Sequence, residues 1–305
     1  MTIVSIFNNK GGEGKSTVTV GLAEFLAGNR DRKVLVIDLD AQASSSCALL
    51  GNRIIRQATE EGKTSAELMA KLRSSRKPID DVEPFICWRA GTETRGSSLG
   101  ELAVMVPDGP RMFEMEEAMN WKKDTQLMLS RLKPALETFD FVLVDLPANV
   151  KKSSTFCING LAMSDFILIP TRPSRISLEG LPLTFDTIRY VQDLNTNGRP
   201  AILGLMSNAT DKRFQQYKSN FPSVLKYSKA GDLPPVFAHH WPPMPALETA
   251  TDERRDFETL KERFGSAYDY ARKVTREFEK RCLEFEQQKP ARPIRKTIWQ
   301  TLGLK

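Results

Sequence analysis

Continuous apolar runs alternate with helix-like stretches along most of this chain. A run without polar alternation is typical of a strand buried on both faces of a sheet, and the stretches between the runs have helical spacing. This alternation predicts an α/β fold, a doubly wound and mostly parallel sheet flanked by helices. The runs lie at residues 2–8, 33–40, 101–107, 139–147, 165–171 and 201–208, with a weaker one at 234–240.

Two regions depart from this alternation. Residues 52–100 are charged and turn-rich, with little strand pattern, and read as an addition to the core. Over residues 252–288, apolar side chains recur in steps of three and four, which predicts one long helix, or a helix pair if Gly265 breaks it. We expect this stripe to pack on the sheet, with contact to a partner subunit as the alternative. The predicted organisation is a main domain at 1–251, this helical extension, and a basic tail at 289–305.

The composition excludes several classes of protein. Of the 305 residues, 40% are hydrophobic and 27% charged, as in a folded globular protein. No apolar run nears the ~20 residues of a transmembrane helix, and the N-terminus lacks a signal-peptide pattern, so we expect a cytoplasmic protein. Four cysteines without paired spacing argue against a disulfide framework and a zinc ribbon, and two histidines, His239 and His240, are too few for a multi-histidine metal site.

The positive charge is concentrated at one end of the chain. Of the net charge of +6, five charges come from residues 287–305, where no acidic residue occurs. The rest of the chain is nearly neutral, so any affinity for DNA needs a local basic patch or the tail itself.

The strongest chemical pattern follows the first apolar run. Glycines between a strand and a helix let backbone N–H groups converge on phosphate oxygens at the helix N-terminus. Lys15 would neutralise the β- and γ-phosphates and the Ser16 hydroxyl would ligate Mg²⁺. Asn9 stands where the general phosphate-loop pattern has its first glycine; a chance glycine turn is the alternative. The predicted ATP-binding residues of KGGEGKST are Gly11, Gly12, Glu13, Gly14, Lys15, Ser16 and Thr17.

Polar residues also stand where three later runs end. Asp38 and Asp40 close VLVIDLD, and Asp145 closes FVLVD. Open α/β sheets bind ligands at the carboxyl ends of their strands, so these carboxylates are expected near the phosphates, with Asp145 suited to hold Mg²⁺. Each could instead be an ordinary loop cap. Asn208 closes AILGLMSN and could hydrogen-bond adenine, although a plain turn residue fits nearly as well.

The segments KGGEGKST, IDLDAQASSS and VLVDLPAN, in this order, resemble the deviant Walker A, Walker A′ and Walker B motifs of ParA/MinD-type partition ATPases. The resemblance covers most of residues 1–260 and implies a P-loop NTPase fold, ATP and Mg²⁺ as cofactors, and slow ATP hydrolysis stimulated by a partner. It further implies a homodimer that sandwiches ATP, in which Lys10 reaches the partner's phosphates. The implied catalytic residues are Lys10, Lys15 and Asp40, which orients the hydrolytic water; the implied metal-site residues are Ser16, Asp38 and Asp145; and Asn208 matches the adenine-reading asparagine.

Several positions depart from the family pattern. Glu13 replaces a small or apolar residue and brings a negative charge into the phosphate loop, where it could weaken nucleotide affinity or contact a partner subunit. The usual proline is missing after Asp40, and Leu146 stands where a smaller or β-branched residue is common. The addition at 52–100 leaves the cargo open, but not the ATPase.

The resemblance implies two candidate surfaces for the ATP-bound dimer. A ParA-like protein binds DNA without sequence preference, associates with the nucleoid, and positions a plasmid, chromosome or large cargo with a ParB-like or adaptor protein. Each phosphate contact would then steepen the dependence on salt. Ordinary solvated charges are the alternative for each basic residue of the candidate patch. These are Lys212, Arg213, Lys218, Lys226, Lys229, Lys261 and Arg263.

A MinD-like membrane switch is the second hypothesis. Residues 294–304 place Ile294, Ile298 and Leu302 on one helical face beside basic residues, as in an interfacial amphipathic helix. A DNA-binding arm, a disordered end or a docked segment are alternatives for the same tail.

Other functions of this ATPase class fit the sequence less well. This chain lacks the suitably placed cysteines that an electron-donating iron protein would need, and a ligase would need residues 52–100 to bind its substrate. A plain interaction module would leave the phosphate loop unexplained.

Overall fold

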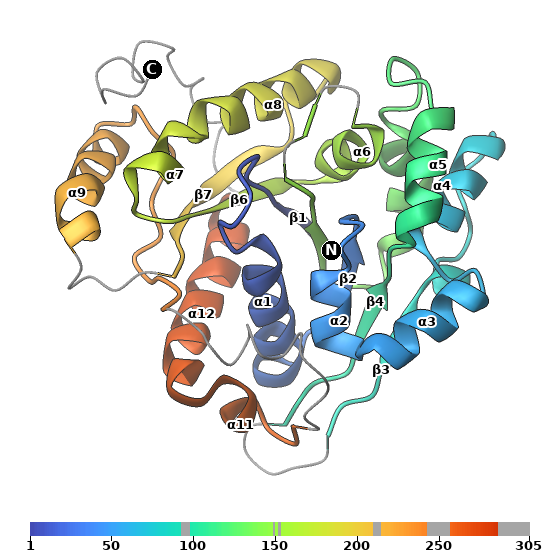
Figure 1. Cartoon of the computed structure of the whole chain (residues 1–305), viewed down its shortest axis with the longest axis horizontal. Coiled ribbons are helices and arrows are strands. Elements are labelled where there is room, and N and C mark those ends of the chain that lie inside the picture. The colour runs from blue at the N-terminus through green and yellow to red at the C-terminus, as the bar shows by residue number, and fades with distance from the viewer. Residues whose placement is uncertain (93–97, 149, 152–153, 210–214, 243–256, 286–305) are drawn as a thin grey trace.

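The computed structural model describes residues 1–92, 98–148, 150–151, 154–209, 215–242 and 257–285. Within these ranges seven strands form one sheet in the order β3-β4-β2-β5-β1-β6-β7 (Figure 1). All neighbouring pairs are parallel except β3 with β4. The strands are β1 Thr2–Ile6, β2 Val34–Asp38, β3 Cys87–Arg89, β4 Leu102–Met105, β5 Phe141–Asp145, β6 Phe166–Thr171 and β7 Ala201–Ser207.

Helices cover both faces of this sheet, as the doubly wound prediction requires. One face carries α1 Lys15–Arg30, α2 Ser44–Leu50, α3 Asn52–Glu60, α11 Leu260–Phe264 and α12 Tyr268–Phe285. The other carries α4 Ser65–Ser74, α5 Gly109–Ala118, α6 Thr155–Met163, α8 Leu181–Leu194 and the short turns Met128–Leu132 and Lys133–Leu136. The remaining elements are Glu83–Phe85, α7 Arg175–Glu179, α9 Gln215–Lys229 and Gly265–Ala267.

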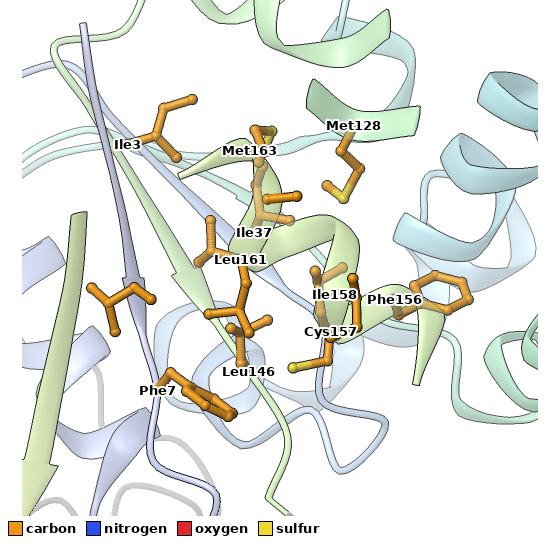
Figure 2. Close-up of a cluster of buried hydrophobic side chains, with 14 of the residues drawn as sticks. Ile3, Phe7, Ile37, Met128, Leu146, Phe156, Cys157, Ile158, Leu161 and Met163 are labelled. Carbon is orange, nitrogen blue, oxygen red and sulfur yellow. The ribbon is translucent and has the colours of Figure 1, made fainter. Parts of the chain in front are cut away.

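Side chains along each strand alternate between two hydrophobic cores. In β1, Ile3 packs toward α6 while Val4 packs toward α1, and Ile37 and Val36 of β2 divide in the same way. Figure 2 shows the first core, where Ile3 and Ile37 lie with Leu161 and Met163 of α6 and with Met128. Because both faces are buried, the strands read as continuous apolar runs, and the predicted sheet is confirmed.

One local expectation was wrong, and one short strand was not recognised. Residues 234–240 form no strand and contribute only an isolated bridge between Val236 and Leu205 of β7. The addition at 52–100 contains β3, a three-residue edge strand, antiparallel to β4, that its weak pattern did not reveal. A strand this short buries too little apolar surface to produce a recognisable run.

The C-terminal stripe is a helix pair that breaks at Gly265. That residue has φ 48°, a conformation that glycine adopts most readily. Ala271, Val274 and Phe278 of α12 are buried in the core on the α1 face of the sheet, so the stripe packs on the sheet. The predictions for residues 252–256 and 286–305 lie outside the described residues. Within the described ranges, none of the helices combines the length and apolar character needed to cross a bilayer.

Candidate functional site

The glycine-rich loop connects β1 to α1 at the carboxyl end of the central strand. Gly14 is the N-cap of α1 and has φ 83°, in the left-handed region. A Cβ atom there would lie 1.8 Å from Nδ2 of Asn208, whose side chain crosses the loop from the end of β7. Gly14 therefore meets two independent requirements, one of backbone conformation and one of space, as a residue of a built phosphate loop should.

Asn9, which replaces the first glycine of the general pattern, has a structural role. It is buried, and its side chain pairs with both backbone groups of Val150: the Val150 N–H donates to Oδ1 at 2.5 Å and Nδ2 donates to the carbonyl at 3.3 Å. Its own N–H donates to the Thr184 hydroxyl of α8 at 3.0 Å. Asn9 thus ties the phosphate loop to the segment that follows β5 and Asp145, which a glycine could not do.

Two buried carboxylates meet at the ends of neighbouring strands. Asp38 of β2 stands directly opposite Asp145 of β5 in the parallel register. Asp38 accepts hydrogen bonds from the Ser45 and Ser46 hydroxyls, at 2.8 and 2.7 Å. Both carboxylate oxygens of Asp145 are buried and have no hydrogen-bond partner among the described residues. Native proteins rarely leave such atoms unpaired, so Asp145 is a candidate to bind a ligand.

The protonation of this pair reflects its burial. Burial raises the pKa of Asp145 to about 7, with a further contribution from the charge of Asp38, and these effects outweigh the lowering effect of the nearby Ser16 and Ser45 hydroxyls and of the Lys15 charge. Burial likewise raises the pKa of Asp38 to about 6, against the lowering effect of the hydrogen bonds from Ser46 and Ser45. Both carboxyls therefore ionise close to neutral pH, and a cation at this place favours their charged forms.

Lys15, the first residue of α1, lies next to these acids. It is 7% exposed. Burial lowers the pKa of its ammonium, while the charges of Asp145 and Asp40 oppose that effect. Asp40 itself is half-buried just beyond β2, and its N–H donates to Asp38 at 3.1 Å. Lys15, Asp38, Asp40 and Asp145 are thus brought together at one edge of the sheet, as the sequence predicted.

The donor set fits a magnesium ion that arrives with a nucleotide. Nowhere in the described part of the chain do three or more His, Cys, Asp or Glu side chains gather as a metal cluster. Mg²⁺ commonly uses one or two carboxylates and takes its other ligands from water and phosphates. The unpaired oxygens of Asp145 and the half-buried hydroxyl of Ser16, on the first turn of α1, match that need.

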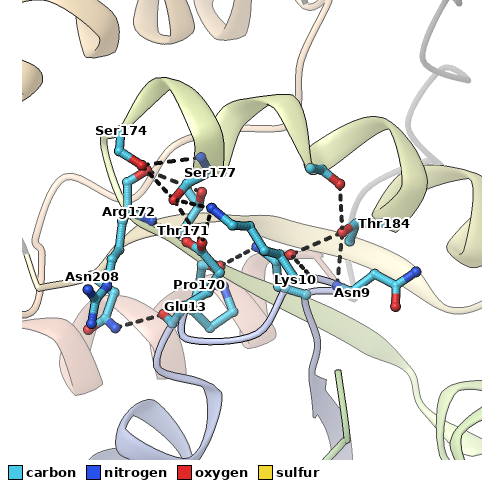
Figure 3. Close-up of polar contacts among 12 residues, drawn as sticks. Asn9, Lys10, Glu13, Pro170, Thr171, Arg172, Ser174, Ser177, Thr184 and Asn208 are labelled. Carbon is cyan, nitrogen blue, oxygen red and sulfur yellow. Dashed lines mark hydrogen bonds and ion pairs between the residues drawn. The ribbon is translucent and has the colours of Figure 1, made fainter. Parts of the chain in front are cut away.

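Lys10 and Glu13 point toward Ser177 of α7 (Figure 3). The Glu13 side chain is 1% exposed, accepts the Arg172 N–H and the Ser177 hydroxyl at 2.7 Å each, and lies 3.3 Å from the Lys10 ammonium. Lys10 also donates to the Ser177 hydroxyl at 3.3 Å. Its side chain is 29% exposed. The two lysines of the loop therefore differ: Lys15 lies among the acids, while Lys10 lies at the surface.

Asn208 contacts the loop itself. Its Nδ2 donates to the carbonyl oxygen of Glu13 at 2.7 Å, and the residue is buried. This contact places Asn208 beside the phosphate loop; its predicted adenine contact stays a prediction.

The candidate DNA-binding residues do not form one patch. Lys218, Lys226 and Lys229 are exposed on α9, whereas Lys261 is exposed on α11, well apart from α9 in Figure 1. Arg263 was assigned wrongly: it is buried and forms an ion pair with Glu24 of α1 at 3.0 Å, so it cannot meet a phosphate. Lys212, Arg213 and the tail at 289–305 lie outside the described residues.

Sequence reasoning did not assign roles to several residues that build the site. They supply hydroxyl groups from α2, α7 and α8, and the sequence around a serine or threonine does not show whether its hydroxyl faces solvent or a buried partner. Only Ser45 and Ser46 carried a signal, as part of the quoted IDLDAQASSS motif. The residues in question are Ser45, Ser46, Ser177 and Thr184.

A glycine-rich loop at the end of a central parallel strand, with acids at the ends of two neighbouring strands, defines a P-loop nucleoside triphosphatase. The model of the AAA domain family matches residues 1–199, and the chain belongs to that family as a ParA/MinD-type ATPase.

Relatives and solved structures agree with this assignment. An uncharacterized protein of Methanocaldococcus jannaschii is 28% identical over 232 residues, 73% of this chain and 82% of its own. The chromosome partitioning protein ParA of Myxococcus xanthus is 27% identical over 195 residues, 63% of this chain and 60% of its own. The fold is similar to that of Cyanothece McdA in complex with ATP, with a TM-score of 0.68 and 19% identity over 93% of this chain and 96% of that one. It is also similar to pNOB8 ParA bound to nonspecific DNA, with a TM-score of 0.59 and 18% identity over 94% and 99%.

Proposed function

We propose that this protein is a ParA-like partition ATPase whose ATP-bound homodimer holds DNA without sequence preference and releases it when ATP is hydrolysed. The observation that carries the proposal is that the two lysines of the phosphate loop, Lys15 and Lys10, lie in different surroundings. Lys15 is buried among the acids of its own subunit, whereas Lys10 of the same loop lies partly exposed at the surface and contacts Ser177 of α7. Once it leaves that contact, a lysine so placed can reach the phosphates of a nucleotide held by a second copy.

The residues at the strand ends have distinct parts in hydrolysis. Lys15 would bind the β- and γ-phosphates, and the Ser16 hydroxyl and Asp145 would hold a magnesium ion. That ion, when bound with ATP, neutralises phosphate charge. Asp38 orders the first turn of α2 through Ser45 and Ser46, and Asp40, half-buried beside it, orients the attacking water. Phosphoryl transfer depends on position and charge more than on a strong base, so a site without histidine is sufficient.

Replacement of Lys10 tests the dimer. We expect Lys10→Ala to abolish dimerisation in the presence of ATP and Mg²⁺, measured by light scattering after size exclusion, because phosphate charge at the interface would stay unneutralised. Lys122→Ala, which removes an exposed lysine beside Trp121, is the matched control and should dimerise like the wild type. A Lys10→Ala protein that dimerises and hydrolyses ATP normally would contradict the proposal.

The proposal includes binding of DNA by the ATP-bound dimer. The exposed lysines of α9 and the DNA-bound structure of pNOB8 ParA support it. The test is anisotropy of a labelled duplex of arbitrary sequence with Asp40→Ala protein, in ADP and in ATP, over a salt titration. We expect binding with ATP only. Exchange of Lys218 and Lys229 for alanine should reduce the salt slope by about one for each phosphate that is no longer neutralised, and Lys280→Ala on α12 should not.

The same experiment separates the membrane alternative. If neither nucleotide supports DNA binding, the DNA-based proposal fails. Flotation with anionic vesicles, using full-length protein and a variant lacking residues 290–305, then decides whether the tail anchors a MinD-like switch. Cargo and stimulating partner would be sought only after the surface that the dimer holds is known.

A further inference from the structure

Glu13 is an acid inside a phosphate loop, yet its charge is not directed at the loop's interior. Its carboxylate faces the segment that joins β6 to α7, where the Arg172 N–H, the Ser177 hydroxyl and the Lys10 ammonium surround it (Figure 3). With its side chain only 1% exposed, Glu13 has almost no water to replace these partners. The acid therefore depends on Lys10 for its one neutralising cation among these contacts.

Lys10 is held by the same contacts. An ammonium group has three N–H donors, and two of those of Lys10 are directed within its own subunit, to Glu13 and to the hydroxyl of Ser177, at 3.3 Å each. The aliphatic part of its side chain passes Gly180, where a Cβ atom would lie 3.3 Å from Cδ of Lys10. The Lys10 side chain thus folds back against the phosphate loop, α7 and the start of α8.

We propose that Glu13 is a positioning residue that holds Lys10 within its own subunit and so raises the protein concentration needed for ATP-dependent dimerisation. This inference rests on the proposed function, in which Lys10 contacts the partner's phosphates. While both contacts are kept, at most one N–H of the ammonium is free, so Lys10 must leave Glu13 or Ser177 to direct more than one donor at phosphates across an interface. Dimerisation therefore has to break at least one of these contacts within the subunit, and the free energy of what is broken makes dimerisation less favourable by the same amount.

The size of the effect follows from the kind of contact. A hydrogen-bonded ion pair with one buried partner is stronger than an exposed pair, because water competes for it poorly. Removal of one such interaction changes an equilibrium by about tenfold. Glu13 thus makes the monomer the favoured state until the nucleotide supplies enough phosphate charge to draw Lys10 away.

The variant Glu13→Gln tests this directly. Glutamine has the same shape, can accept the Arg172 N–H and can donate to Ser177, but it carries no charge for Lys10. We expect the protein concentration for half-maximal dimerisation, measured by analytical ultracentrifugation with a non-hydrolysable ATP analogue and Mg²⁺, to fall about tenfold. Glu284→Gln, which removes an exposed ion pair with Lys280 on α12, is the matched control and should leave that concentration unchanged.

A second measurement reports on the contact without a dimer. In the nucleotide-free monomer, acylation of Lys10 by a limiting amine reagent is followed by mass spectrometry, with Lys122 as the internal reference. Release from Glu13 should make Lys10 react several times faster in Glu13→Gln than in the wild type. Ser177→Ala, which removes the shared hydroxyl and keeps the acid, should produce a smaller change in the same direction and covers the case that Glu13→Gln does not fold.

The outcomes separate this inference from the function on which it rests. Unchanged or weakened dimerisation of a folded Glu13→Gln protein overturns the retaining role, even if the wild type dimerises with ATP as proposed. A wild type that stays monomeric with ATP overturns the proposed function and, with it, the effect of Glu13 on dimerisation. The acylation rates then show whether the contact between Lys10 and Glu13 exists. Faster acylation together with easier dimerisation supports both.

Discussion

Two of the buried charge clusters among the described residues differ in one respect. The first, which we call the closed cluster, joins Glu24 of α1 with Arg89 of β3 and Arg263 of α11, at 2.5 and 3.0 Å. The second, the open cluster, comprises Asp38, Asp145 and Lys15 at the strand ends. In the closed cluster the acid has two cations; in the open cluster Asp145 has unpaired oxygens.

The pKa values of the two acids move in opposite directions for this reason. Burial alone would raise the pKa of Glu24, but Arg263 and Arg89 outweigh it and lower the pKa. Burial raises the pKa of Asp145 to about 7, because its surroundings compensate it too little. Paired charge thus connects elements of the fold, and the incompletely compensated acids at the strand ends are suited to bind a ligand.

Removal of the acid of the closed cluster should have the largest effect. Glu24→Ala leaves two arginines facing each other in a buried site, and we expect a loss of about 3–5 kcal/mol in the free energy of unfolding, measured by urea denaturation at pH 7. In the wild type this contribution is present above the unfolded pKa near 4.5 and is lost as pH falls through the lowered folded value. A loss below about 1 kcal/mol would show that the cluster is not structural.

Removal of one cation should cost less, because the other remains. Arg89→Met keeps Glu24 paired with Arg263 but loses two hydrogen bonds to Glu24 and one to the Gly100 carbonyl. We expect a loss of about 2 kcal/mol in the same urea assay. An effect as large as that of Glu24→Ala would show that Arg263 alone cannot compensate the acid.

The open cluster should respond in the opposite sense. Since the folded pKa of Asp145 is raised, its neutral form favours folding at low pH, and that stability is lost as pH rises from about 4 to about 7. Relative to the wild type, Asp145→Asn should therefore gain about 2 kcal/mol in the free energy of unfolding between pH 5 and pH 8, measured by urea denaturation without nucleotide. The same difference between variant and wild type at both pH values would mean that Asp145 is compensated after all. The same variant should lose ATP hydrolysis.

An exposed pair provides the smallest effect and calibrates the others. Lys280 and Glu284 lie one turn apart on α12, 3.5 Å from one another, with both side chains more than half exposed. Glu284→Gln should change the free energy of unfolding by less than about 0.5 kcal/mol and the change should vanish in high salt. A larger effect would indicate that α12 contributes to stability through charge as well as through its buried stripe.

The fold could be predicted well wherever buried side chains produce an apolar run or a regular apolar period in the sequence. Six of the seven strands among the described residues were recognised as apolar runs, and the helix pair was recognised by its stripe and by Gly265. The strand β3 escaped because three residues at a sheet edge produce no such pattern. The phosphate loop was recognisable since its chemistry depends on local backbone geometry, which glycines mark directly.

Charged side chains were predicted less well, because their partners lie far along the chain. Arg263 looked like a surface cation, but its partner Glu24 belongs to α1, and Arg89 reaches the same acid across 65 residues. Glu13 looked like a charge near phosphates, yet it accepts its hydrogen bonds from Arg172, 159 residues away, and from Ser177. Neither separation leaves a pattern in the sequence.

The sequence by itself determined the parallel sheet, the phosphate loop and the acids at the strand ends, because periodic burial and strand–loop–helix geometry are local properties. The tertiary structure alone decided which charges are compensated. It pairs Glu24 with two arginines, leaves Asp145 open, and folds Lys10 back onto Glu13. Whether a buried charge supports the fold or is suited to a ligand depends on the groups that packing brings within a few ångströms, and those groups come from distant parts of the chain.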